Sequence, residues 1–325
     1  MMQTFRLKFL GLLVFILAAI FMPFFTTDYW IFVFSLAYYY TIMALSWNLL
    51  GGYTGQFSLG HHTFAVIGGY TSTLLMVKTG VPLWMGILAG IILTLILSFV
   101  LGVLCLRMRG LYLALITWAF AEVVRVYIRM DFEFTGGDRG LFTPMIFDTK
   151  SPLPYYYVFL GACVFTIILI AAIMHSRVGY YLKSIRNDEI AARCMGVNTV
   201  RWKIFAFMVA SGLAGIAGAL YAHSVGLVSP IMGEFNEMAM IIIFVVIGGM
   251  RTQAGPVVGS ISIRYLMELF RQWSEIRIVI LSAVVILIMR FFNGGLMELF
   301  KRANRLAQQK LVGKGISAYT QTGEK

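Results

Sequence analysis

The sequence predicts an all-α fold, a polytopic bundle of about ten transmembrane helices, from three observations. Of the 325 residues, 60% are hydrophobic and only 12% are charged, whereas soluble domains have about 45–50% apolar and about 25% charged residues. The hydrophobic residues form runs long enough to cross a hydrocarbon core of about 30 Å, which takes about 20 helical residues. Lys and Arg lie between these runs, where such residues orient a membrane chain.

Ten hydrophobic runs are candidates for spans. They cover residues 9–25, 30–50, 58–77, 83–106, 111–129, 155–174, 204–226, 237–250, 254–270 and 276–293. The run 237–250 is too short to cross upright and 58–77 begins with polar residues, so either can be re-entrant, and the count can fall to eight or nine. Arg6 and Lys8 precede the first run as in a signal peptide, but no small-residue cleavage site follows, so we expect a retained helix.

The distribution of positive charge predicts that both termini are cytoplasmic. With the N-terminus inside, the inner segments hold seventeen Lys and Arg residues and the outer segments hold four, as the positive-inside rule requires. Residues 1–295 then form the membrane domain, with an inner loop at 175–203, and 296–325 form a cytoplasmic tail. The net charge of +12 is dispersed rather than gathered on one face, which argues against nucleic-acid binding.

The sequence contains no recognisable catalytic or metal site. Cys105, Cys163 and Cys194 are too scattered for a disulfide framework or a Cys/His cluster, so we expect no metal and no cofactor. A GxxxxGK[ST] phosphate loop is absent, so ATP is not bound by that route. His61 lies near Ser58, but no carboxylate is close in sequence to orient the ring. A membrane enzyme that uses this pair is therefore a minor alternative.

Two Gly-rich breaks interrupt hydrophobic runs in a similar way. Residues 49–52 with Gln56 match residues 246–249 with Gln253 at a constant offset of 197. Transporters often carry internal repeats whose interrupted helices border the transport path, although two similar turns could also arise by chance. Asn48, Gln56 and Ser58 cluster around the first break and are candidates for the translocation pathway, with polar contacts between helices as the alternative.

Charged residues inside spans are a further clue, because each costs about 2.5–3.5 kcal/mol at a helix centre. Glu122 and Arg125 are three residues apart, and Arg264 and Glu268 are four apart, so each pair shares a helical face. For Glu122 and Arg125 both mutual pairing and a place in the translocation pathway stay open. For Arg264 and Glu268 we expect pairing, or side chains that extend to the lipid headgroups.

The inner loop 175–203 is expected to contain a short helix at about 188–195. Asn187 suits its N-cap, Asp188 and Glu189 suit its positive end, and Gly196 suits a left-handed C-terminal residue. The small side chains of Ala191 and Ala192 would allow another surface to approach closely.

These residues resemble the ATPase-docking loop of importer permeases of the ATP-binding cassette (ABC) type, in the variant found in branched-chain amino-acid permeases. The similar stretches run from Ser176 to Gly179 and from Ile185 to Gly196. Further similar stretches are residues 52–61, 109–122, 229–230, 248–249 and 255–256. The stretch 109–112 and the outer loop 135–137 favour a LivM-type over a LivH-type subunit.

The resemblance implies a transport subunit of the inner membrane and not an enzyme. Its implied partners are a second, LivH-like permease subunit, two ATP-binding cassette ATPases, a periplasmic solute-binding protein and the lipid bilayer. The implied ATPase-coupling residues are Arg186, Asp188, Glu189, Ala191, Ala192 and Gly196. Branched-chain amino acids are the implied solute. Urea or another small solute is the alternative, and a self-sufficient secondary transporter or channel is a more distant one.

Overall fold

The computed structural model describes residues 16–105, 108, 110–149, 151–273 and scattered residues from 279 to 297. Its helices are α2 (Asp28–Trp47), α3 (His61–Thr79), α4 (Leu83–Cys105), α5 (Leu111–Met130), α6 (Phe132–Thr135), α7 (Leu153–His175), α8 (Arg177–Asn187), α9 (Glu189–Cys194), α10 (Thr199–Val225), α11 (Phe235–Gly248) and α12 (Ala254–Leu269). The short elements are η1 (Met22–Phe25), the π-helical η2 (Asn48–Thr54), η3 (Gly137–Arg139), η4 (Pro230–Gly233) and the strands β1 (Leu141–Phe142) and β2 (Leu227–Val228). The two strands pair antiparallel.

The predicted all-α membrane bundle is confirmed, whereas ten spans are not. Five helices in the described part are long and apolar enough to cross a membrane: α2 continued by η2, α4, α5, α7 and α10. α3 has 19 residues but starts with polar side chains, and α11 and α12 have 14 and 16 residues. The run 276–293 and the tail 296–325 lie almost wholly outside the described residues, and only Ile16–Phe25 of the first run appears, as a short apolar helix.

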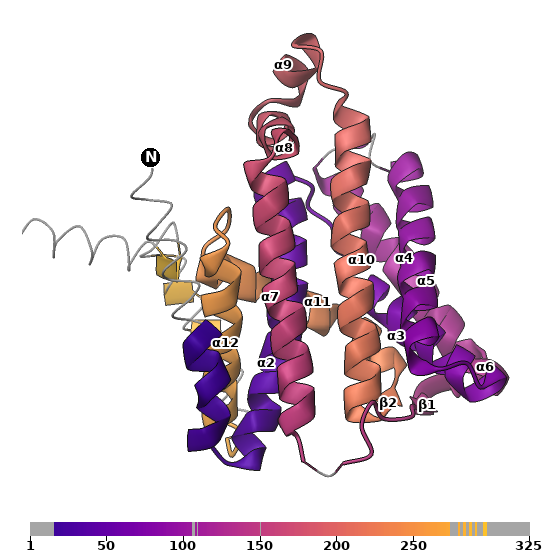
Figure 1. Ribbon diagram of the computed structural model, residues 1–325. Helices are drawn as coiled ribbons and strands as arrows, with labels where there is room; N and C mark the ends of the chain where they lie inside the picture. Colours follow the sequence, from indigo (N-terminus) through magenta and orange to yellow (C-terminus); the bar gives the residue numbers. More distant parts are fainter. Residues whose placement is uncertain are drawn as a thin grey trace, which may run out of the picture.

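Helices α2 and α10 form the centre of the bundle (Figure 1). In the most apolar stretch of each helix, about 72% of the residues are buried in α2 with η2 and 67% in α10. The corresponding share is 28–39% in α4, α5 and α7. The outer helices expose large apolar side chains such as Trp84, Leu104 and Val123. Because the exposure of so much apolar surface to water is unfavourable, lipid or another membrane subunit is expected to cover it.

Glycines bring α3, α4 and α10 into backbone contact. A Cβ atom on Gly218 would lie 1.9 Å from the carbonyl oxygen of Ala65, and one on Gly68 would lie 2.3 Å from that of Gly215. On α4, Gly90 approaches the carbonyl oxygen of Gly68 in the same way. Small residues at such crossings allow the close van der Waals packing that holds helices together in lipid.

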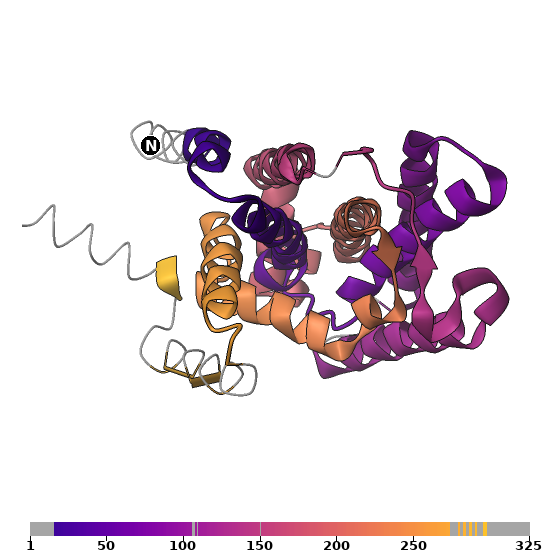
Figure 2. The same cartoon turned by 90° about the horizontal axis from the view of Figure 1, so that it is seen from below.

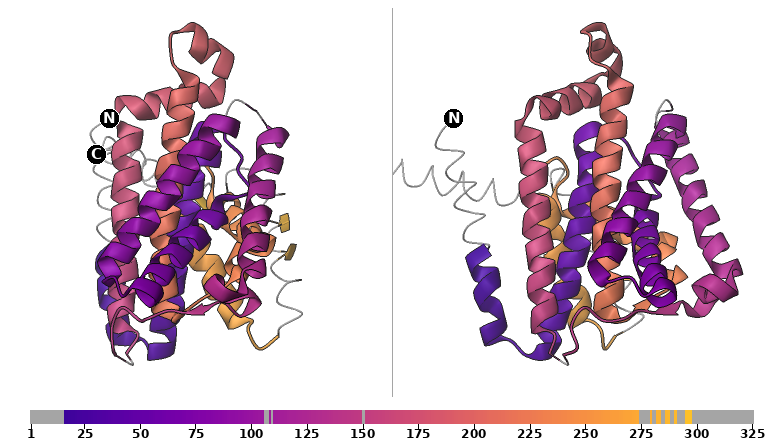
Figure 3. Two further views of the ribbon diagram at one scale, coloured as in Figure 1. Left: turned by 90° about the vertical axis from the view of Figure 1, so that its right-hand side faces the viewer. Right: turned by 45° about the vertical axis from the view of Figure 1, so that its right-hand side comes forward.

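The two ends of the bundle differ. α8 lies across one end and α9 projects beyond it, whereas η3, β1, β2 and the connection into α7 lie at the opposite end (Figures 1 and 3). α11 lies across the bundle when α10 is seen end-on (Figure 2). This orientation fits its length, since 14 residues at 1.5 Å each reach only about 21 Å.

Candidate functional site

The inner loop folds into two helices, α8 and α9, of which the sequence predicted the second. The cap of α9 differs from the prediction: Asp188, not Asn187, accepts hydrogen bonds from the backbone N–H groups of Ile190 (2.8 Å) and Ala191 (3.0 Å). Asn187 instead ends α8, because the chain becomes extended only at Asp188 (φ −155°, ψ 111°). Gly196 has φ +82°, the left-handed geometry expected after the helix.

The exposed tip of α9 is apolar. Ala192 is buried against the protein and Ala191 is exposed, so the two alanines do not share one docking face. Ile190 and Met195 are 63% and 85% exposed. These two large side chains give the tip a surface suited to a partner protein. The sequence analysis did not predict a role for Ile190 and Met195, because it considered only the small residues Ala191 and Ala192 as a contact surface.

An ion pair fastens α9 to the start of α10. The ammonium of Lys203 lies 2.6 Å from Glu189 Oε2, and their side chains are 7% and 12% exposed. Arg193, which is 59% exposed, reaches Glu189 Oε1 at 3.2 Å. Glu189 therefore holds the helix to the bundle in addition to facing the positive end of α9.

Arg186 points away from the exposed tip and into the bundle. Its guanidinium donates a hydrogen bond to the carbonyl oxygen of Gly52 in η2. Its Cγ lies 3.3 Å from the place of a Cβ on Gly55, a residue with φ +74°. Burial and the nearby positive charge of Arg251 lower the pKa of Arg186. It thus connects the segment predicted to dock an ATPase to the first polar break.

The structure brings the two predicted polar breaks together. Asn48 Nδ2 donates to the carbonyl oxygen of Thr252 (2.9 Å), and Asn48 Oδ1 accepts from the N–H of Arg251 (3.2 Å). Gln56 Nε2 donates to the carbonyl oxygen of Lys203 (3.3 Å). The buried Gln56 Oε1 and Ser58 Oγ have no hydrogen-bond partner among the described residues. Asn48 thus links helices, whereas Gln56 and Ser58 each keep a buried polar atom without a partner among the described residues.

Glu122 and Arg125 lie apart from these breaks, on α5. Arg125 Nε donates to Glu122 Oε2 at 3.0 Å, so the mutual pairing foreseen as one alternative is present. Arg125 also packs beside Gly233 of η4. The five pathway candidates therefore form two groups, Asn48, Gln56 and Ser58 at the centre and Glu122 with Arg125 at the periphery.

Of the two alternatives expected for Arg264 and Glu268, mutual pairing is wrong. Glu268 instead accepts hydrogen bonds from Tyr29 and from Arg271, whose Nη1 lies 3.3 Å away. The guanidinium of Arg264 lies over the ring of Tyr40, 5.3 Å from its centroid. A contact between residues so distant in sequence outweighs the helical spacing that suggested the pair.

Among the residues that the structure describes, Ser58 Oγ pairs with no histidine. His61 Nε2 forms a hydrogen bond with Ser46 Oγ at 2.8 Å, and His62 Nε2 forms one with the carbonyl oxygen of Gly233 at 2.9 Å. Within the described ranges, no three His, Cys, Asp or Glu side chains are grouped to hold a metal ion.

Comparison with known proteins gives one consistent result. The family described as branched-chain amino acid transport system / permease component matches residues 29–292. The LivM permease protein of the high-affinity branched-chain amino acid transport system of Escherichia coli is 30% identical over 308 residues, covering 86% of this chain and 72% of that protein. The corresponding LivH protein of Salmonella typhimurium is 22% identical over 284 residues, covering 79% and 91%.

A probable LivM protein of Methanocaldococcus jannaschii is 22% identical over 273 residues, covering 71% of this chain and 79% of that protein. No solved structure matches the chain. The higher identity to the bacterial LivM protein agrees with the predicted LivM-type subunit, and these relatives are transport subunits rather than enzymes. Together with the helical bundle and its polar breaks, the match over most of the chain means that this protein belongs to the family of permease components of branched-chain amino acid transport systems.

Proposed function

We propose that this chain is the LivM-type permease subunit of an ABC importer that moves branched-chain amino acids inward across the inner membrane. The names of its relatives support the solute class. The observation that carries the mechanism is the pair of contacts that join the α8–α9 segment to the polar break, Arg186 to Gly52 and Glu189 to Lys203.

The proposed topology has eight to ten spans with both termini in the cytoplasm. It places α9 inside and the segment with η3 and β1 outside, in agreement with their opposite ends of the bundle (Figure 1). The proposed assembly contains a LivH-like second permease, two ATP-binding cassette ATPases and a periplasmic solute-binding protein. The exposed apolar side chains of α4 and α5 are suited to the second permease or to lipid.

In the proposed coupling, an ATPase binds the apolar tip of α9 at Ile190 and Met195. Movement of α9 passes to α10 through the ion pair of Glu189 with Lys203, whose carbonyl oxygen binds Gln56. Movement of α8 passes to η2 through Arg186. Both routes end at the break that holds the free polar atoms of Gln56 and Ser58, so ATPase motion would open or close the path there.

The test is co-purification of the ATPase with the Glu189→Lys/Gly196→Val double variant. Glu189→Lys places a positive charge beside Lys203, and Gly196→Val puts a branched residue at φ +82°, which costs about 1 kcal/mol or more. We expect normal membrane insertion, loss of the ATPase from the complex and loss of uptake. The matched control is Gly161→Val on α7. A Cβ at this position would have no neighbouring atom within 4 Å, so this variant should behave as wild type. Retention of the ATPase at wild-type stoichiometry with normal transport would contradict the coupling role.

A further inference from the structure

Two opposite charges face the interior of the bundle without pairing with each other. Glu237 on α11 and Arg264 on α12 are both half-buried. Neither has an ion-pair partner within 4 Å in the part of the chain that the structure describes. Charged groups inside membrane helices are costly, and those that are retained commonly mark a substrate or ion site. This pair calls for an explanation that the coupling segment does not give.

Tyr40 on α2 stands between the two charges. Its hydroxyl donates a hydrogen bond to Glu237 Oε2 at 2.8 Å. The guanidinium of Arg264 lies over its ring, 5.3 Å from the ring centroid. The Nε of Arg264 is buried and has no hydrogen-bond partner among the described residues. A buried donor without a partner is destabilising, and more so on a charged group. The site therefore offers a directed N–H group to a ligand that brings an acceptor.

The walls of this site are aromatic. Tyr39 and Tyr221 pack at 4.7 Å between ring centroids, Tyr39 lies 5.0 Å from Tyr40, and Phe244 closes on Tyr40 at 5.5 Å. The rings come from α2, α10 and α11. They surround the charged groups with surfaces that suit an apolar side chain.

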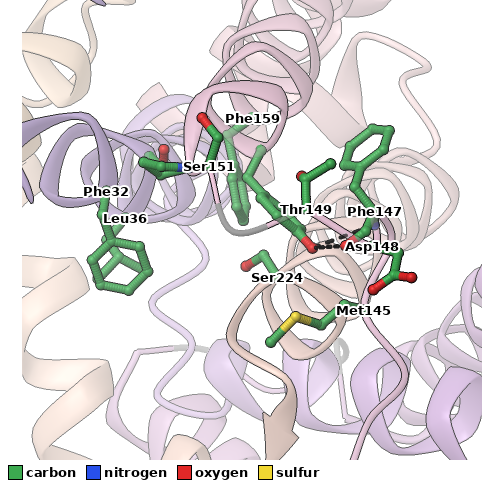
Figure 4. Close-up of a pocket in the computed structure, with 12 residues that line it drawn as sticks. Phe32, Leu36, Met145, Phe147, Asp148, Thr149, Ser151, Phe159 and Ser224 are labelled. Atoms are coloured by element: carbon green, nitrogen blue, oxygen red, sulfur yellow. Dashed lines mark hydrogen bonds between the residues drawn. The ribbon is translucent and has the colours of Figure 1, made fainter. Parts of the chain in front are cut away.

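A pocket of about 480 Å³ lies between α2, the start of α7 and the end of α10 (Figure 4). Its lining includes Ser35 and Leu36 of α2, Ser224 of α10 and Asp148 of the outer segment. Ser35 and Leu36 precede Tyr39 and Tyr40 by four residues, about one helical turn. Ser224 follows Tyr221 by three residues on α10, which runs in the opposite direction. The pocket is thus placed one turn outward of the tyrosines, where a solute entering from outside would arrive first.

We propose that Arg264, Glu237 and Tyr40 bind the zwitterionic head of a free amino acid in transit. The α-carboxylate of the solute accepts hydrogen bonds from the guanidinium fork of Arg264, including its free Nε. The α-ammonium pairs with the carboxylate of Glu237, and the apolar side chain lies against the tyrosine rings. This inference rests on the proposed function and narrows its solute, because an uncharged solute such as urea would leave both charges unpaired.

The test compares leucine uptake with ATP hydrolysis in proteoliposomes that contain the complete importer and its binding protein. The variants are Arg264→Gln, Glu237→Gln and Arg264→Lys, which keeps the charge but loses the fork. The control is Arg271→Gln, which removes a 63% exposed cation two residues beyond the end of α12. We expect each of the three variants to assemble and to lower leucine uptake per ATP hydrolysed at least about tenfold, with the control within twofold of wild type.

The outcomes separate the site from the function on which it rests. If the wild-type importer moves no leucine, the proposed function fails and the site fails with it. Wild-type uptake with unchanged uptake in Arg264→Gln and Glu237→Gln would overturn the site alone. If all three variants fail to assemble by size-exclusion chromatography, the two charges hold the bundle together and the site is likewise overturned.

Discussion

The replacement Glu189→Gln would test whether one ion pair holds α9 on the bundle. At the 2.6 Å that separates Lys203 Nζ from Glu189 Oε2, two unit charges attract by about 6 kcal/mol at an effective dielectric constant of about 20. Desolvation offsets much of this, and removal of one partner of a buried pair costs about 3–5 kcal/mol. We expect a loss of about 3 kcal/mol, and therefore opening of α9 that is about 150-fold more frequent.

Hydrogen exchange in lipid nanodiscs measures this opening, with a peptide over residues 189–197 as the probe and a peptide from the centre of α10 as the internal reference. The matched control is Arg193→Gln, which removes the more exposed partner of the same carboxylate. Exposed pairs contribute at most about 1 kcal/mol, so the control should speed exchange by no more than about fivefold. If Glu189→Gln accelerates exchange no more than Arg193→Gln does, the ion pair to Lys203 is not the anchor.

Three further predictions follow from the packing and the proposed orientation. Gly218→Val should force α3 and α10 apart by at least about 1 Å, since its Cβ would lie 1.9 Å from the carbonyl oxygen of Ala65. The free energy of unfolding should fall by about 1–3 kcal/mol or more, and the unfolding temperature with it. The control Gly161→Val should leave the unfolding temperature unchanged. Arg186→Lys should keep the charge but lose the reach to η2, so that leucine uptake falls about tenfold while the ATPase still co-purifies; normal uptake would remove Arg186 from the coupling route. The native Cys194, which is exposed, should react with an impermeant thiol reagent only after permeabilisation, whereas Phe142→Cys in a Cys194→Ser background should react in intact cells; the reverse pattern would invert the topology.

Local features were predictable from the sequence. The hydrophobic runs located α2, α4, α5, α7 and α10, because the length and hydropathy of a span depend on consecutive residues. The position of Gly196 after α9 followed from local backbone preference. The predicted N-cap, Asn187, was one residue too early. Asn and Asp are both good capping residues, and only the extended backbone at Asp188 shows which of the two caps α9.

The assembly of the candidate site depends on contacts between residues distant in sequence, which no spacing rule supplies. Arg186 reaches a carbonyl oxygen 134 residues away, and Tyr40 reaches Glu237 at a separation of 197 residues. The two predicted Gly-rich breaks meet at separations of 203 and 204 residues, which differ from the offset of 197 that relates their sequences. Helical spacing alone misled for Arg264, where an aromatic ring on α2 replaced the expected carboxylate.

The meeting of the two polar breaks also has a consequence for the transport cycle proposed above. Asn48 joins one break to the other, and Trp47, Asn48, Leu49 and Leu50 around it are almost fully buried. At the other end of the bundle the pocket that includes Asp148 is open. In the proposed orientation the two breaks close the inner side and the pocket lies toward the outer side, the arrangement expected of the outward-facing stage of an alternating-access cycle. For the inner side to open at this place, Asn48 would have to exchange both hydrogen bonds for other partners.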